Sequence, residues 1–379
     1  MLKVCLEKLN NQVINDLTEE DLCIICNSTF KTSTQIKNKL FLKRVKHFIN
    51  ENLSLLKDPA VLITFLKTLR HNRYQDDDIL STLSCTIFFN KTISCYSFTA
   101  LSHILAVYSD YLYYDEPLLK AFSQEGLNLL KESKYVSKDT YLSEQPRLKD
   151  IKRFLWALSN LNYKLEKEDI ENCILPQVQE RLKDSDPKTI VDIILYMWMM
   201  NYKAIDLINE CLNDTNIQKI KATNPISQRS LNLLLICMYY EDIDMYNKLK
   251  TRPNLSHKYH HNKQLQRRPV LRDINNHFSA ISKEFDIDKC DLHCQIPFIN
   301  IIGITGFRKN IYKLVNIEVL DDYTCLKNTD RVPTGLMDLK LRLLDKCDEA
   351  LIVVNTEDII NNKESEVQEI LRNELSLVC

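Results

Sequence analysis

The sequence predicts a mainly α-helical protein in which an α-helical-repeat, solenoid-like body is followed by a small C-terminal α/β module. The 379 residues include only 4 glycines and 10 prolines, which favours long helices joined by short connections. A loose repeat recurs between residues 60 and 215. From about residue 297, short apolar runs typical of strands replace the helical period.

The repeat has four recognisable copies, at residues 65–74, 104–113, 154–163 and 194–202, and their starts lie about 40 residues apart. Each copy places apolar residues at helical spacing and then runs through a Tyr-containing turn into a second amphipathic helix. One helix pair cannot bury its own apolar stripe, so neighbouring pairs must stack into a solenoid. The longer gap between the second and third copies holds the polar residues 131–147, where we expect a domain break.

Four regions are therefore expected along the chain. N-terminal helical repeats occupy residues 1–145, a second repeat region 146–215, a helical connecting region 216–300 and the α/β module 301–379. Within the last two regions we expect a helix at 229–240, strands at 298–302, 314–320 and 351–354, and helices at 336–347 and 363–377.

Composition excludes several classes of protein. The net charge of -1 gives no global attraction to nucleic acid or to an anionic membrane. Thirteen cysteines without a repeating frame, and no secretory apolar run, predict reduced thiols. The longest apolar runs fall far short of the roughly 20 residues of a membrane-spanning helix, so no membrane span is expected. Acidic residues such as Glu7 and Asp16 come too early for a clear mitochondrial presequence, so the cytoplasm is the alternative location.

The C-terminal module resembles a known family. Its residues 316–323 (NIEVLDDY), 333–335 (PTG), 339–344 (LKLRLL), 350–354 (ALIVV), the acidic pair 357–358 and the closing helix 367–372 occur in the order of a RAP domain. A RAP domain that follows Leu-Trp-Ala-Leu-like repeats is similar to the FAST kinase domain-containing family of mitochondrial RNA regulators. Residues 146–215 and 216–300 would then be the two helical FAST-type regions.

The resemblance implies a RAP domain with a restriction-endonuclease-like fold and a location in the mitochondrial matrix. It implies binding of single-stranded RNA and control of the processing or stability of mitochondrial transcripts. RNA and other RNA-processing proteins are the expected partners, whereas DNA and a cofactor are not expected. Because the sequence has no glycine-rich phosphate loop, no His-Arg-Asp loop and no Asp-Phe-Gly, we expect no kinase activity and no enzyme.

Two sets of residues are candidate RNA contacts. In the module, one ring that could stack on a base accompanies four cations that could bind phosphate: Tyr323, Lys327, Arg331, Lys340 and Arg342. Residues 318–379 nevertheless carry fourteen acidic and seven basic side chains, so binding requires a segregated patch. The stronger basic cluster lies earlier and contains Lys258, Lys263, Arg267, Arg268 and Arg272, for which a solvated helix face is the alternative interpretation.

A metal-dependent RNA endonuclease is the first alternative function. Glu318, Asp321 and Asp322 lie at a strand end, where carboxylates could hold a divalent metal that activates water. No Glu-x-Lys follows a strand, however, and a polar strand edge explains the same residues. The second alternative is a helical-repeat scaffold that binds proteins and has no affinity for RNA.

Three further arrangements suggest metal ligands but favour structural roles. They are Cys23 with Cys26, the trio His257, His260 and His261, and the group Cys290, His293 and Cys294. None has a matched second pair, and thiols in apolar helical runs behave as small core residues, so no metal is expected. The two tryptophans, Trp156 and Trp198, lie among apolar residues of repeat helices and are predicted to be in the core.

Overall fold

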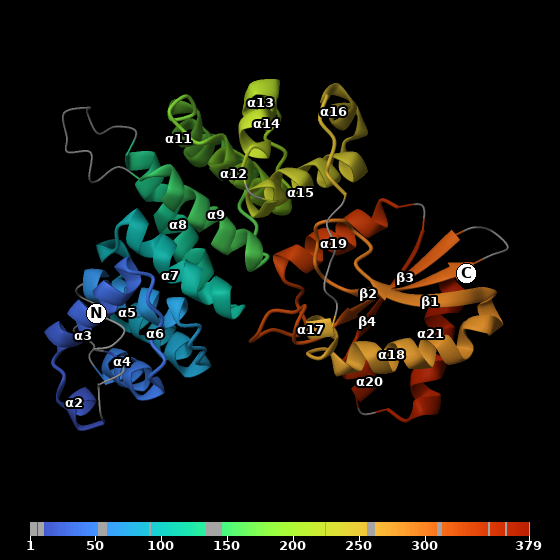
Figure 1. Ribbon diagram of the computed structural model, residues 1–379, viewed down its shortest axis with the longest axis horizontal. Coiled ribbons are helices and arrows are strands. Elements are labelled where there is room, and N and C mark those ends of the chain that lie inside the picture. The colour runs from blue at the N-terminus through green and yellow to red at the C-terminus, as the bar shows by residue number, and fades with distance from the viewer. Residues whose placement is uncertain are drawn as a thin grey trace. The chain divides into compact units, whose positions relative to one another are not determined.

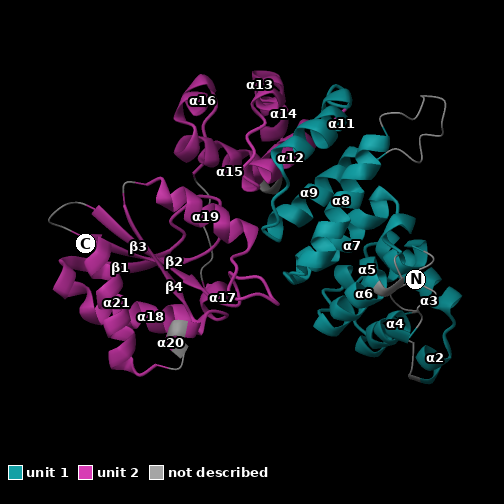
Figure 2. Ribbon diagram, turned by 180° about the vertical axis from the view of Figure 1, so that it is seen from behind, with its two compact units in different colours: residues 1–184 teal, residues 185–379 magenta. Residues whose placement is uncertain are grey.

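A computed structural model describes residues 6, 11–51, 59–90, 92–133, 146–223, 225–255, 262–308, 313–347, 349–360 and 362–378 (Figure 1). The chain divides into two compact units, residues 1–184 and 185–379 (Figure 2). A mainly helical body is followed by a C-terminal mixed four-stranded sheet with helices, which confirms the predicted fold class at this level. In the described part of the chain, no helix is both long and apolar enough to cross a membrane.

The regular elements formed by the described residues of unit 1 are all helical. Its α-helices are α2 (Asn11–Asp16), α3 (Glu19–Lys31), α4 (Lys39–Glu51), α5 (Pro59–His71), α6 (Asp77–Asn90), α7 (Phe98–Tyr111), α8 (Glu116–Glu132), α9 (Leu148–Asn160), α10 (Lys167–Asp169) and α11 (Leu175–Glu180). A 3₁₀ turn, η2 (Ile93–Cys95), precedes α7, and a π-helical turn, η3 (Ile170–Ile174), joins α10 to α11.

The first helices of successive repeats form one layer, because α3 packs on α5, α5 on α7 and α7 on α9. These four helices end alike. Each is followed by a residue in the left-handed conformation, and the next residue is Tyr or Thr; the left-handed residues are Ser33, Arg73, Leu112 and Asn162. The N–H of the residue after each left-handed residue donates a hydrogen bond to a carbonyl of the preceding helix. The N–H of Tyr74, for example, donates to Leu69 O at 3.0 Å. The Tyr-containing turn that the sequence indicated is thus a helix C-cap, and it recurs about every 40 residues.

His103 of α7 gives unit 1 a testable pH dependence. The side chain is buried, and burial together with the nearby charge of Arg153 lowers its pKa to about 3; Lys67 and Arg70 act in the same direction and Asp150 opposes them. Below about pH 6.5, His103 therefore binds a proton in the unfolded chain but not in the folded chain. We expect stability to fall as the pH drops from about 6.5 toward 3, by up to about 1.4 kcal/mol per pH unit.

His103→Gln is expected to remove most of this slope, as measured by urea unfolding between pH 7 and pH 5 with circular dichroism. His47→Gln, in an exposed position on α4, is the matched control and should keep the wild-type slope. Equal slopes in the two variants would contradict the role of His103.

Unit 2 begins with five helices: α12 (Pro187–Met199), α13 (Ile205–Cys211), α14 (Asp214–Lys221), α15 (Pro225–Glu241) and α16 (Ile243–Lys248). Helix α12 contains the fourth repeat copy and packs against α13, α14 and α15. It ends in the same kind of turn, with Asn201 left-handed and the N–H of Tyr202 donating to Met197 O at 2.9 Å. Trp198 of α12 is buried, which confirms its predicted place in the core.

The α/β part of unit 2 consists of α17 (Asn262–Leu265), α18 (Pro269–Ile281), η4 (Ser282–Phe285), β1 (Ile287–His293), β2 (Gly303–Arg308), β3 (Lys313–Leu320), α19 (Gly335–Asp345), β4 (Ala350–Asn355), α20 (Glu357–Ile360) and α21 (Glu364–Val378). The sheet order is β1-β2-β3-β4. The first two pairings are antiparallel, and β3 and β4 are parallel, with Ile317 opposite Ile352.

The two faces of the sheet differ in chemistry. Helices α18 and α21 cover one face, where Phe278, Ile317 and Leu371 belong to one apolar core (Figure 1). Because side chains alternate along a strand, Asn316 and Glu318 of β3 point to the other face, on which α19 lies. Helix α18 and strand β1, although they precede residue 301, share the core of the later strands.

The expected strands agree with the structure in part. The strands predicted at 314–320 and 351–354 and the helices at 336–347 and 363–377 are confirmed as β3, β4, α19 and α21. The strand predicted at 298–302 is wrong: the segment leaves a turn at Phe298, which has a positive φ of 67°, and continues without regular structure until β2 begins at Gly303. Strand β1 was not predicted, because most of its side chains are polar.

Candidate nucleic-acid interface

Two segments that the sequence singles out separately meet at Tyr323. The amide of Gln264, in α17, donates to Tyr323 Oη at 3.3 Å and to Asn300 O at 2.9 Å, and its oxygen accepts from Ile302 N at 2.6 Å. The guanidinium of Arg268 lies 5.7 Å from the centre of the Tyr323 ring. The basic segment 262–272 is thereby held against the loop that follows β3.

Arg268 is the residue that joins the two segments. It is 1% exposed and donates to Asp321 Oδ2 at 2.6 Å, to Ile302 O at 2.6 Å and to Val319 O at 2.9 Å. The Asp321 carboxylate also accepts from the main-chain N–H groups of Tyr323 and Thr324, at 3.0 and 3.1 Å. These hydrogen bonds are charge-assisted or made to main chain, and together they hold the buried guanidinium and the loop that carries the Tyr323 ring in place.

Two acidic residues, Asp273 and Asp322, are exposed in this region, and Asp322 is paired with Arg331. The cations Lys263, Arg267 and Arg272 are exposed as well, and Tyr323 is half-buried. We call these four residues the Tyr323 surface. Arg272 also donates to Leu265 O at 3.1 Å, which ties the first turn of α18 to α17. Exposed cations on a segment that contacts a Tyr ring could bind phosphates while the ring stacks on a base.

The other candidate RNA contacts have different places. Lys327 is exposed on the loop after β3, and Lys258 lies outside the described residues. Arg331 is ion-paired with Asp322 at 2.5 Å and Glu357 at 3.0 Å, and its pKa is raised, mainly by the hydrogen bond to Asp322.

Three of the predicted phosphate ligands require correction. Arg268 and Lys340 have almost no exposed surface, so as placed they cannot reach a polyanion. Arg342 packs inside unit 2, where it donates to Glu241 Oε1 at 2.6 Å and to Trp198 O at 2.9 Å. These three cations hold elements of the protein together.

The three carboxylates of the nuclease hypothesis are not gathered at one point. Glu318 accepts from Lys340 at 2.5 Å, Asp321 from Arg268, and the exposed Asp322 from Arg331. Each carboxylate therefore has its own cation. Among the described residues, no group of three or more His, Cys, Asp or Glu side chains is arranged to hold a metal ion.

The pair of Glu318 and Lys340 is the most deeply buried ion pair of the module, with both side chains fully inaccessible. Burial lowers the pKa of Lys340, and the charge of Glu318 opposes this effect. Lys340 also donates to Ile301 O at 3.0 Å. Gly303 lies against Glu318, and a side chain at this position would collide with Glu318 Oε1 and with the Gln295 amide, so the close approach requires glycine.

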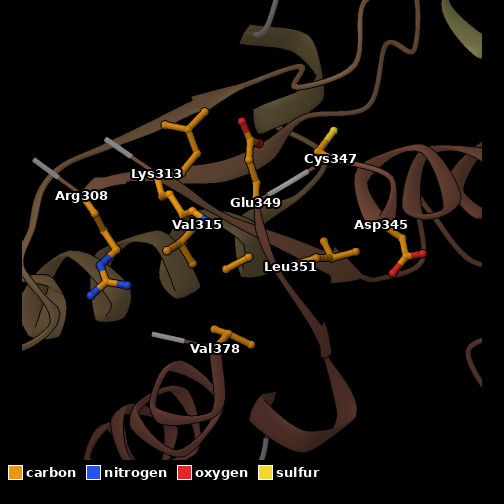
Figure 3. Close-up of a pocket in the computed structure, with 10 residues that line it drawn as sticks. Arg308, Lys313, Val315, Asp345, Cys347, Glu349, Leu351 and Val378 are labelled. Atoms are coloured by element: carbon orange, nitrogen blue, oxygen red, sulfur yellow. The ribbon is translucent and has the colours of Figure 1, made fainter. Parts of the chain in front are cut away.

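A cavity of about 420 Å³ opens at the other end of the sheet (Figure 3). Arg308 and Lys313 line one end of it and Asp345 the other, with Glu349 between them. Because cations and carboxylates balance, this cavity does not favour a polyanion, and we assign no ligand to it.

The candidate metal ligands behave as structural residues where they are described. Burial raises the pKa of the Cys26 thiol to about 12 and that of Cys294 to about 11, which keeps both protonated at neutral pH. Burial also raises the pKa of Cys290. The histidines at 257, 260 and 261 lie outside the described residues.

No protein-family model matches this sequence, and no curated protein is found to be similar to it.

Sequence reasoning did not identify Gln264, although it connects the two segments. Its three polar contacts lie 36 to 59 residues away along the chain. A lone glutamine in a basic stretch gives no sequence signal for such a role.

Proposed function

We propose that this protein binds single-stranded RNA and thereby regulates the processing or stability of mitochondrial transcripts. The observation that carries the proposal is the convergence of the basic segment 262–272 with Tyr323. Gln264 of this segment donates to Tyr323 Oη, 59 residues away along the chain, and the buried Arg268 donates to Asp321, so these contacts join the segment that carries the exposed cations to the ring. The surface combines phosphate binding with stacking, which is how proteins contact unpaired RNA.

The resemblance of residues 316–372 to a RAP domain supports the same proposal, as does the helical-repeat body that precedes the module. The mitochondrial matrix as location, other RNA-processing proteins as partners and a restriction-endonuclease-like fold of the module are parts of this proposal and follow from the resemblance alone. Catalysis is not part of it, because the three carboxylates are each held by a separate cation.

We expect Lys263→Gln/Arg267→Gln to weaken binding of the chain to a labelled 20-nucleotide single-stranded RNA by roughly fivefold to twentyfold, because two phosphate contacts are lost. Fluorescence anisotropy between 50 and 200 mM salt measures this, and the slope of log K against log salt should decrease by about 1.4.

The matched control is Lys283→Gln/Lys363→Gln, which removes two exposed cations from the same α/β part. It should bind RNA as the wild type does. Equal losses in the two variants would show a non-specific charge effect and would reject the Tyr323 surface.

The same titration separates the alternatives. RNA products that form only with magnesium would favour the endonuclease. A wild-type chain that binds no RNA at 50 mM salt would reject the proposal and favour a protein-binding scaffold.

A further inference from the structure

The first-helix layer of unit 1 carries an accumulation of positive charge that the function proposed above does not use. Lys67 and Arg70 lie on α5, Arg153 on α9, and Arg147 and Lys149 at the start of α9. Arg147 and Arg153 share the carboxylate of Asp150, and Arg70 of α5 lies over the Trp156 ring of α9. In keeping with this arrangement, burial first, and then the charge of Arg153, lowers the pKa of Lys67; Asp150 opposes this effect, and Arg147 and Lys149 add to it. Crowded like charges favour the binding of an anion, which relieves their repulsion.

Two carboxylates face these five cations. Asp110 pairs with Arg70. Asp150 is fully buried and accepts from Arg147 at 2.7 Å, from Arg153 at 2.6 Å and from Thr99 at 3.1 Å. With His103 neutral, the cluster has a net charge of about +3, although the whole chain has -1.

His103 lies in the middle of this cluster. It is 8% exposed, and no described residue provides a hydrogen-bond partner for its buried Nδ1 atom. A buried ring nitrogen without a partner is uncommon in folded proteins, and a ligand is one of the groups that can satisfy it.

Aromatic rings accompany the cations. The guanidinium of Arg70 lies 5.3 Å from the centre of the Trp156 ring, and Lys67 Nζ lies 5.7 Å from the centre of the Phe30 ring. Trp156 was predicted to be a core residue, but it is only partly buried, whereas Phe154, Leu155 and Leu158 of the same helix are fully buried. Arg70 and Trp156 belong to helices α5 and α9, which lie on either side of α7 in the layer.

We infer that this layer is a second binding site for single-stranded RNA, in which Lys67, Arg70 and Lys149 contact phosphates and a base extends the stack of Arg70 on Trp156. The inference rests on the proposed function and adds a site to it in the other unit. Adjacent packed helices are about 8–10 Å apart, and α7 lies between α5 and α9, so cations on α5 and α9 suit a chain of phosphates better than one small anion. A planar guanidinium on an aromatic ring is also a surface on which a base stacks.

Lys67→Gln/Lys149→Gln tests the site, because it removes two cations that do not hold the buried Asp150. We expect roughly fivefold to twentyfold weaker binding of a labelled 20-nucleotide RNA and a salt slope smaller by about 1.4. The matched control is Lys120→Gln/Lys131→Gln, with the same change in charge, at exposed positions of α8, the second helix of a pair. The control should bind as the wild type does.

Tryptophan fluorescence tests the stacking independently. The chain has two tryptophans, and Trp198 is buried, so RNA that stacks at the layer should quench the emission of Trp156. Trp156→Phe should lose the quenching, and Lys67→Gln/Lys149→Gln should require higher RNA concentrations to produce it.

The outcomes distinguish the two sites. If the wild type binds RNA but Lys67→Gln/Lys149→Gln binds as tightly as its control, the layer is rejected and the proposed function stands. If the wild type binds no RNA, both are rejected. If RNA binds without a change in Trp156 emission, the proposed base stacking is rejected. If polyglutamate binds with the same affinity as RNA, RNA is rejected as the ligand and an acidic protein partner is favoured.

Discussion

Lys340→Met is expected to lower the free energy of unfolding of unit 2 by about 3–5 kcal/mol. The substitution keeps most of the side-chain volume but leaves Glu318, which is fully buried, without its cation. Glu318 Oε2 already has no partner among the described residues, so the remaining charge has little to compensate it. Urea unfolding followed by Trp198 fluorescence, in a Trp156→Phe background, reports unit 2 alone.

Two controls define what is lost. Lys346→Met, at the exposed end of α19, should stay within about 0.5 kcal/mol of the wild type. Glu318→Leu/Lys340→Met removes both charges and should recover most of the lost stability, since a buried pair often contributes little compared with apolar residues. If Lys340→Met alone is as stable as the wild type, the proposed contribution of the Glu318–Lys340 ion pair is contradicted.

Arg342→Leu is expected to destabilise unit 2 by about 2–4 kcal/mol and to loosen α19 from α12 and α15. Arg342 donates to Glu241 Oε1 at 2.6 Å and to the carbonyls of Trp198 at 2.9 Å and Met199 at 3.3 Å. The Glu241 carboxylate is nearly buried and would lose its cation while keeping the hydrogen bond from Trp198 Nε1 at 2.5 Å. Hydrogen exchange of the amides in α19 measures the loosening.

The matched control for Arg342→Leu is Arg372→Leu. Arg372 pairs with Glu284 in an exposed position on the same unit, and an exposed pair contributes little. Exchange in α19 should be unchanged in this variant. If Arg342→Leu also leaves the exchange of α19 unchanged, the attachment of α19 depends on its apolar contacts alone.

The repeat could be predicted from the sequence because its signals are local. Each of the four copies lies in one helix and ends in a left-handed residue followed by Tyr, at Tyr74, Tyr113, Tyr163 and Tyr202. Helical spacing and a C-cap involve residues within one or two turns, so single-sequence patterns contain them. Helix α3 precedes these four copies and ends in the same way at Ser33, but it has Thr in place of Tyr.

Non-local contacts account for what could not be predicted. Strand β1 is mostly polar and is a strand because it pairs with β2, which begins ten residues after β1 ends. The candidate site depends on contacts such as Arg268 with Asp321, 53 residues apart. Charge alone suggested that Arg268 and Lys340 would meet solvent, and in the structure both are buried.

For Lys340, a signal did exist. It lies three residues after Met337 and four before Leu344, both buried, so it occupies the apolar stripe of α19. A lysine at such a position predicts a buried acidic partner, and Glu318 in the adjacent strand is that partner. The spacing of Lys340 was a better guide to its role than its charge.

The contact between Arg70 and Trp156 has a consequence for how unit 1 unfolds. In an array whose helices touch only their neighbours, stability is a sum of adjacent terms, and the ends can fray independently. Arg70 and Trp156 come from α5 and α9, with α7 between them in the layer. This contact couples helices that are not adjacent, so we expect loss of α9 from the array also to weaken α5, and the central repeats to unfold with greater cooperativity than the helices before them.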